Sequence, residues 1–218
     1  MKKFQLNAQP RVELGKKSVK ALRKEGKIPA VINGGELVEL PYNGTLKEGQ
    51  KLVAIGKDQK RAIITTDIVV TAEDVRKLIY TPDIFEVDIT LNGEVVKTVV
   101  KDLQFQPVKD TLLHIDFLQV YPDKPIVMEV PVQIEGHAEG VKAGGKLTLS
   151  MRKLKVKALC SEIPERLVVN VDTLGLGKSL AVGDLHFEGL QLMNAKNAVV
   201  CAVQLTRAAR GAAAKAEA

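Results

Sequence analysis

Apolar and polar residues alternate with a period of two along much of this chain, and that pattern restricts it to a structure built mainly from β-strands. Between Phe85 and Leu91 every second residue is apolar, and the residues between them are Glu, Asp and Thr. Such alternation is typical of a strand with one face toward a core and one toward solvent. Asn92-Gly93 follows and favours a tight hairpin turn, with a return strand at Val95–Val100. We therefore predict a mainly β fold with helices, of the α+β class.

A proline-containing segment, Tyr121–Pro125, is the expected linker between two domains. Beyond it the alternation recurs in four segments, 126–134, 153–158, 167–171 and 199–205. These segments predict a C-terminal all-β domain over residues 122–207, and the first domain is expected to span residues 1–121. Residues 208–218 are rich in Ala and charge and lack an apolar face, so a disordered tail is expected there.

The first domain should contain at least two helices and enough strands to close a small barrel. One helix is expected between Gly15 and Gly26, and another begins at Thr71, with Asp74 three residues on as in a capping box. Residues 43–62 contain five Gly, Asn or Asp residues and four Lys, which favours a hairpin or loops. Strands are expected at 4–9, 28–32, 37–42 and 112–120, with 37–42 a candidate to pair with 28–32. We predict an N-terminal closed β-barrel with helices.

The basic residues of the chain are concentrated at its beginning. Nine of the 32 Lys/Arg but only two of the 26 Asp/Glu lie in residues 1–27, so the +6 net charge comes entirely from this segment. On a helix, Lys16, Lys20, Arg23 and Lys27 share an arc about 60° wide. A localised basic face of this kind either is simply solvated or neutralises phosphates of a nucleic acid.

Composition narrows the kind of nucleic acid. Aromatic residues make up 4% of the chain and Trp is absent, which argues against an extended platform that stacks single-stranded bases. An RNA partner should therefore be folded and recognised through its shape and phosphates. Neither an N-terminal signal peptide nor a stretch long enough to span a membrane is visible, so a cytosolic protein without a membrane partner is expected.

The sequence offers no catalytic constellation. Gly140–Lys146 has the spacing of a phosphate-binding loop, but Leu147 replaces the Ser/Thr that holds magnesium, and an alternating strand follows instead of a helix. Three scattered His and the distant Cys160 and Cys201 have no metal-ligand spacing and form no disulfide framework. We expect no enzyme activity, no cofactor or metal, and no small-molecule substrate.

His114 and Asp116 form a different kind of candidate site. In a strand these two residues point to the same face, while Ile115 and Phe117 point to the other. A histidine beside a carboxylate can present oriented donors and acceptors to a ribose or a base edge. The same pattern also fits an exposed polar strand face without a ligand.

Three parts of the sequence together resemble one known family. They are Arg11 with Gly15-Lys16, Lys20, Leu22-Arg23 and Gly26–Ile32; Lys101–Gln104 with Leu113–Phe117; and Val130–Val132 with Gly140–Gly145 and Ile163–Glu165. These segments are similar to the bacterial large-subunit ribosomal protein numbered twenty-five, in its long, two-domain form, also called the general stress protein CTC type. The similarity extends over nearly the whole chain.

The resemblance implies a structural constituent of the large ribosomal subunit, located on the ribosome in the cytoplasm, that binds 5S rRNA through its N-terminal barrel. It implies phosphate and ribose contacts for Arg11 and the basic helix, and RNA contacts for His114 and Asp116. Asn33 departs from the family, which usually has Tyr there, so an aromatic contact is lost or replaced by a polar one. The predicted RNA-binding residues are Arg11, Lys16, Lys17, Lys20, Arg23, Lys27, Asn33, His114 and Asp116.

Two other functions remain open at this point. The barrel also resembles the anticodon-binding part of glutaminyl-tRNA synthetase, which favours a transfer-RNA-binding module. A protein–protein adaptor built on the β-rich second domain is the alternative from another class.

Overall fold

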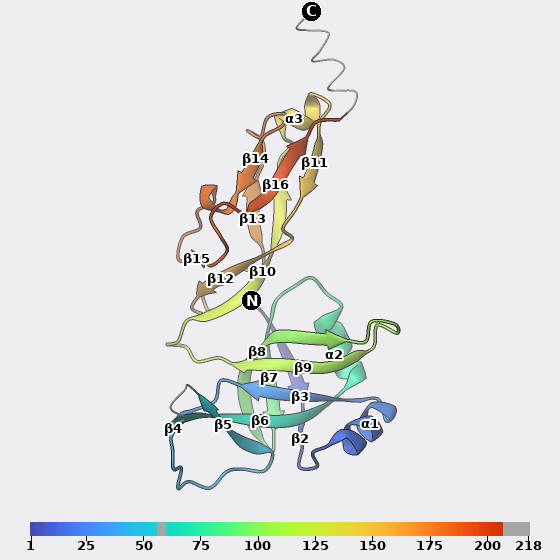
Figure 1. Cartoon of the computed structure of the whole chain (residues 1–218), viewed down its shortest axis with the longest axis vertical. Coiled ribbons are helices and arrows are strands. Elements are labelled where there is room, and N and C mark those ends of the chain that lie inside the picture. The colour runs from blue at the N-terminus through green and yellow to red at the C-terminus, as the bar shows by residue number, and fades with distance from the viewer. Residues whose placement is uncertain (56–59, 207–218) are drawn as a thin grey trace, which may run out of the picture. The chain divides into compact units, whose positions relative to one another are not determined.

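The computed structural model describes residues 1–55 and 60–206, and it is mainly β with few helices (Figure 1). It divides into two units, residues 1–124 and residues 125–218. Each unit is a β domain of its own. The predicted disordered tail, residues 208–218, lies outside the described residues.

The described residues of the first unit, 1–55 and 60–124, form one large sheet and two helices. Its helices are α1 (Lys16–Lys24) and α2 (Ala72–Ile79), and its strands are β1 (Lys2–Asn7), β2 (Gln9–Pro10), β3 (Lys27–Asn33), β4 (Leu37–Glu39), β5 (Gln50–Ile55), β6 (Arg61–Thr71), β7 (Phe85–Leu91), β8 (Glu94–Phe105) and β9 (Leu112–Gln119). Neighbouring strands pair in the order β1-β7-β8-β9-β3-β6-β2, and β4 and β5 also pair with β6. The β1–β7 and β3–β9 pairs are parallel.

This sheet is a half-barrel, so the predicted closure of the barrel is wrong. The first segment of the chain supplies both ends of the sheet, because β1 pairs with β7 while β2 pairs with β6. Within the described residues, β1 and β2 do not pair with each other. Only Ala8 separates them, and two strands that continue in one direction without a turn cannot become hydrogen-bonded neighbours.

The hydrophobic core of the first unit lies on the inner face of the half-barrel. In β9, Ile115 and Phe117 are completely buried, whereas His114 and Asp116 on the opposite face are half-buried. This is the alternation that the sequence predicts for a strand with one face toward a core. Helix α2 adds Val75 and Leu78 to the same core. The other buried members are Leu6, Ile28, Ala30, Ile32, Ile68, Val70, Val87 and Ile89.

Several local predictions are confirmed and others need correction. Asn92 and Gly93 have φ of 49° and 87° and form the predicted hairpin turn between β7 and β8. Thr71 is the N-cap of α2, but its side chain makes no capping hydrogen bond, so the predicted capping box is not formed. Residues 37–39 pair with β6 instead of β3, because β6 and β9 already occupy the two edges of β3.

The second unit is a β domain, as predicted, and its described residues, 125–206, include two short helical turns. Its strands are β10 (Ile126–Glu135), β11 (Lys146–Leu149), β12 (Lys153–Ala158), β13 (Leu167–Asn170), β14 (Ser179–Ala181), β15 (Gln191–Leu192) and β16 (Val199–Gln204), and its turns are α3 (Glu139–Lys142) and η1 (Val182–Asp184). They form a four-stranded sheet, β13-β10-β12-β15, and a three-stranded sheet, β11-β16-β14. The glycine-rich segment Gly140–Lys146 leads into strand β11, which does not match the strand-to-helix context of a phosphate-binding loop.

Candidate nucleic-acid interface

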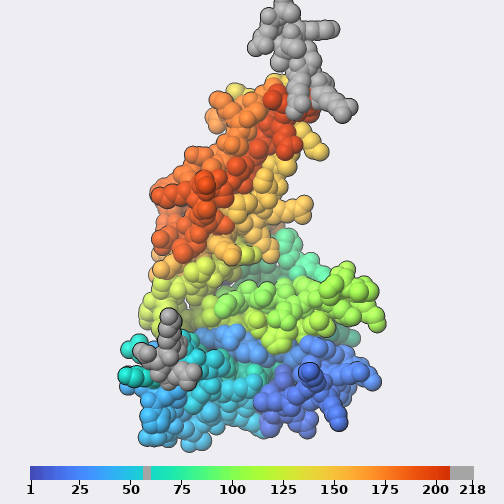
Figure 2. All heavy atoms as spheres, in the orientation of Figure 1, coloured from blue at the N-terminus to red at the C-terminus, as the bar shows by residue number. Residues whose placement is uncertain are grey.

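A glycine flanks the basic helix α1 on each side. Both glycines have backbone conformations that a residue without a side chain adopts most easily. Gly15 at the N-cap has φ of 128°, and Gly26 after the last turn has φ of 74°. None of the nine residues of α1 is fully buried, and Val19 and Leu22 are half-buried. The helix therefore lies on the surface of its unit with its lysines exposed. The N-terminal part of the chain is drawn in blue in Figure 2.

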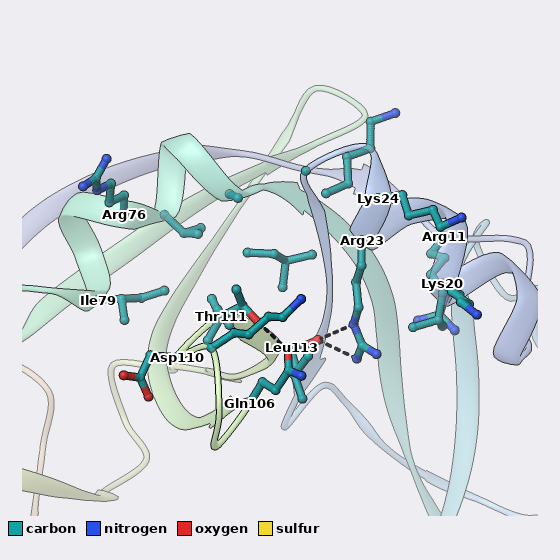
Figure 3. Close-up of a pocket in the computed structure, with 18 of the residues that line it drawn as sticks. Arg11, Lys20, Arg23, Lys24, Arg76, Ile79, Gln106, Asp110, Thr111 and Leu113 are labelled. Carbon is teal, nitrogen blue, oxygen red and sulfur yellow. Dashed lines mark hydrogen bonds between the residues drawn. The ribbon is translucent and has the colours of Figure 1, made fainter.

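The side chain of Arg23 attaches α1 to the sheet. Its Nε and Nη2 atoms donate hydrogen bonds of 3.2 and 2.8 Å to the backbone oxygen of Leu113 in β9 (Figure 3). At the other end of the helix, the hydroxyl of Ser18 and the Nε of Arg11 both donate to the backbone oxygen of Glu13. These contacts fix where the cations of α1 lie relative to the strands.

A groove of about 1670 Å³ opens between α1, α2 and the loop that joins β8 to β9. Its apolar walls include Val19, Ile28, Val75, Ile79 and Leu112. Among the residues that the structure describes, one acidic residue, Asp110, lines the groove, against eight cations. The cations are Arg11, Lys16, Lys20, Arg23, Lys24, Lys27, Arg76 and Lys109. Such an excess of one charge in a concave surface concentrates the field and attracts anions.

Few of these cations are neutralised by the protein itself. Lys27 lies 3.2 Å from the carboxylate of Glu25. Over residues 1–55 and 60–206, Lys16, Lys20 and Lys24 form no ion pair. The charge of the groove is therefore available to a ligand.

Three of the predicted binding residues lie on a second surface, the face of β3 and β9 that points away from the core. Asn33 pairs with Leu118 across these strands, and Asp116 lies opposite Val31. His114 Nδ1 is 3.0 Å from Asp116 Oδ1, but the two atoms do not have the alignment of a hydrogen bond. This half-buried pair can offer donors and acceptors to a sugar hydroxyl or a base edge.

Acidic side chains surround this second surface, so its electrostatics differ from those of the groove. Asp102 lies opposite Asp116 in the β8–β9 pair, and Asp67 lies opposite Val31 in the β3–β6 pair. Asp67 is 3% exposed and forms an ion pair with Lys51. The sheet face is therefore suited to hydrogen bonding, whereas the groove is suited to binding phosphates.

Comparison with known proteins gives matches over almost the entire chain. The model of the Ribosomal L25p family matches residues 6–68 and 46–117. The large ribosomal subunit protein bL25 of Parabacteroides distasonis is 55% identical over 220 residues, covering 99% of this chain and all of the relative. The bL25 proteins of Porphyromonas gingivalis and Phocaeicola vulgatus are 56% and 50% identical over 216 residues, covering 99% of both chains in each case.

The chain belongs to the Ribosomal L25p family.

The second unit of this L25p member matches a separate family model. Residues 125–207 match the C-terminal domain of ribosomal protein TL5. The chain is therefore the long, two-domain form that its sequence motifs indicated. Membership also confirms the prediction of a ribosomal protein of the large subunit, located on the cytoplasmic ribosome and not an enzyme.

The structure divides the nine predicted binding residues of this L25p protein between two surfaces. Arg11, Lys16, Lys20, Arg23 and Lys27 line the groove. Asn33, His114 and Asp116 lie together on the face of β3 and β9. Lys17 is exposed on α1 but does not line the groove.

Four groove residues of this family member, namely Lys24, Arg76, Tyr80 and Lys109, are not among the nine predicted binding residues. Lys24 follows Arg23 on α1 and belongs to the same run of basic residues, so the sequence does contain a signal for it. Arg76, Tyr80 and Lys109 come from α2, the residue after it and the β8–β9 loop. Arg76 and Tyr80 are four residues apart and so share a helix face, but no local pattern connects that face to α1.

The described part of this L25p protein contains no helix long and apolar enough to span a membrane. Over the same residues, no group of three or more His, Cys, Asp or Glu is arranged to hold a metal ion.

Proposed function

We propose that this ribosomal protein binds 5S rRNA through its first unit, and that the groove between α1 and α2 contacts the phosphates of the RNA. The observation that carries the proposal is the charge of the groove, which has eight cations and one acid among its lining residues. Neutralising phosphates with Lys and Arg releases bound counterions and supplies most of the affinity for a nucleic acid.

The nine predicted residues then have different roles. Arg11, Lys16, Lys20 and Lys27 contact phosphates from the groove, and Lys17 contacts a phosphate beside it. Arg23 combines charge with its attachment to β9. Asn33, His114 and Asp116 contact ribose hydroxyls or base edges, because a 2′-OH or a base amine can donate a hydrogen bond to a carboxylate.

Competition binding tests this assignment against a transfer-RNA-binding module. Labelled 5S rRNA bound to the full chain is displaced with unlabelled 5S rRNA or with transfer RNA at physiological salt. We expect 5S rRNA to compete at a concentration at least tenfold lower than transfer RNA. Equal competition, or stronger competition by transfer RNA, would contradict the proposal. Absence of RNA binding would favour a protein–protein adaptor.

A further inference from the structure

Two aromatic side chains lie exposed together at the α2 end of the groove. Tyr80, the residue after α2, lines the groove and is 65% exposed. Phe105, the last residue of β8, is 38% exposed, and the two ring centroids are 6.5 Å apart with an angle of 61° between the planes. The whole chain has only three Tyr and five Phe, so an exposed aromatic pair is unusual for it.

The loop beside this pair is held in one conformation by its own hydrogen bonds. The backbone N–H of Gln106 donates to the oxygen of Thr111 at 2.8 Å, and the N–H of Asp110 donates to the oxygen of Gln106 at 2.9 Å. The Thr111 hydroxyl also donates to the side-chain oxygen of Gln106 at 2.9 Å (Figure 3). The wall that carries Lys109 is therefore formed before any ligand arrives.

Two cations line the same groove as Tyr80. Arg76 lies one helical turn before Tyr80 on α2, and Lys109 lies in the β8–β9 loop. A flat ring that lines the same groove as two cations matches the two parts of a nucleotide, which are a base with a π-face and a phosphate. An apolar protein segment would cover the rings but leave both charges without partners.

We propose that Tyr80, Phe105, Arg76 and Lys109, together called the aromatic corner, hold one unpaired nucleotide of the bound RNA. Its base stacks on the ring of Tyr80, with Phe105 supporting that ring from the side, and Arg76 and Lys109 contact its phosphate. This inference rests on the proposed function, because it places one nucleotide of the RNA at the end of the basic groove. A single nucleotide needs only one exposed ring, which agrees with the low aromatic content of the chain.

Binding of 5S rRNA to variants of the full chain tests the stacking contact. Tyr80→Phe keeps the ring, so we expect its affinity to stay within about twofold of the unchanged protein. Tyr80→Leu removes the ring but keeps an apolar side chain, and we expect a loss of about tenfold. Equal affinity of the Leu variant and the unchanged protein would overturn the stacking contact while leaving 5S rRNA binding itself intact. If the unchanged protein binds no 5S rRNA, the proposed function fails and this inference fails with it.

A pair of neighbouring substitutions tests the phosphate contact. Arg76 and Lys77 are both exposed on α2 and lose the same charge when replaced by Gln, but only Arg76 lines the groove. We expect Arg76→Gln to reduce affinity several-fold and Lys77→Gln to change it less than twofold. Equal losses from the two substitutions would overturn the assignment of Arg76.

Intrinsic fluorescence gives a readout that does not depend on the stability of the Leu variant. Because the chain lacks Trp, a variant with Tyr42→Phe and Tyr121→Phe emits from Tyr80 alone. We expect hexauridylate to quench this emission, and an abasic ribose-phosphate hexamer to quench it far less. Equal quenching by the two hexamers would show that no base stacks on Tyr80 and would overturn the proposal.

Discussion

The guanidinium group of Arg23 donates two hydrogen bonds to the backbone oxygen of Leu113, a residue 90 positions later in the chain. This contact joins the basic helix α1 to strand β9, which carries His114 and Asp116. Because α1 buries none of its residues completely, a side-chain attachment of this kind contributes strongly to its position. Arg23 therefore supplies both charge and geometry to the proposed interface.

Replacing Arg23 by Lys should separate these two contributions. Lys keeps the positive charge but lacks the planar fork that reaches one carbonyl with two nitrogens. We expect Arg23→Lys to lower the free energy of unfolding by about 1 kcal/mol. Lys20→Ala, which removes a charge without an internal hydrogen bond, should lower RNA affinity but leave stability within about 0.5 kcal/mol. Thermal melting and filter binding of both variants measure these effects, and a stability loss confined to Lys20→Ala would refute the role of Arg23.

The salt dependence of RNA binding should come from the groove. Replacing Lys16 and Lys20 together by Gln removes two phosphate contacts, so the log–log slope of affinity against salt should decrease by about 1.4–1.8. The matched control is Lys153→Gln with Lys155→Gln, two exposed lysines of β12 in the second unit. That control should leave the slope unchanged. A titration in which both double variants give the same slope would argue against the groove as the phosphate-binding surface.

Asn33 should tolerate the tyrosine that the family usually has at this position. Among the described residues other than glycine, only Asn92 and Asp110 have positive φ, so Asn33 is not required for a left-handed backbone. Gly34, with φ of 84°, takes that conformation instead. We expect Asn33→Tyr to keep the melting temperature and to hold RNA affinity or improve it by up to about 1 kcal/mol. Asn33→Ala should weaken binding modestly.

Melting and binding curves on both Asn33 variants decide whether this residue contacts RNA. If both substitutions lower the melting temperature while the folded proteins keep their affinity, Asn33 has only a structural role. The half-buried position of Asn33 next to Leu118 leaves room for its amide to reach a ligand from the outer face of the sheet.

Although they missed β6 (Arg61–Thr71), local patterns predicted several strands of this protein, because the alternation of side chains depends only on neighbouring residues. The Asn92-Gly93 hairpin and the burial of Ile115 and Phe117 are examples. Such patterns could not predict whether the barrel closes. Alternation identifies the buried face of a strand but not the strand that pairs with its edge. The position of β1 and β2 at the two ends of the sheet is set by tertiary packing.

The candidate site was predicted only in part, because local patterns do not show which residues of different elements come together. The cations of α1 are a repeat within one helix, and their charge is visible in the sequence. Arg76 and Lys109 reach the groove through folding alone, because they are 33 residues apart and lie in different elements. The sequence did not predict that Tyr80 is exposed. An aromatic residue at the end of an amphipathic helix can equally well be buried.

The second unit should lose stability in acid through one carboxylate. Asp172 accepts a hydrogen bond of 2.7 Å from the backbone N–H of His137, and this bond, followed by the interaction with Asn170, lowers the pKa of the carboxyl group. Because folding lowers this pKa, the stabilisation is present above the ordinary value near pH 4 and disappears as the pH falls through the folded value. Asp172→Asn should therefore reduce the pH dependence of unfolding below about pH 4. Denaturant unfolding between pH 2 and 6 measures it, and an unchanged pH dependence in the Asn variant would contradict this role.

The most direct test of the account compares the two halves of the chain in binding to 5S rRNA. Residues 1–124 contain the groove and the β3–β9 face, and residues 125–218 contain neither. Filter binding at one salt concentration measures the dissociation constant of each fragment and of the full chain. We predict that residues 1–124 bind within about threefold of the full chain and that residues 125–218 bind at least a hundredfold more weakly. Comparable affinity of the second fragment, or loss of binding by the first, would contradict the account.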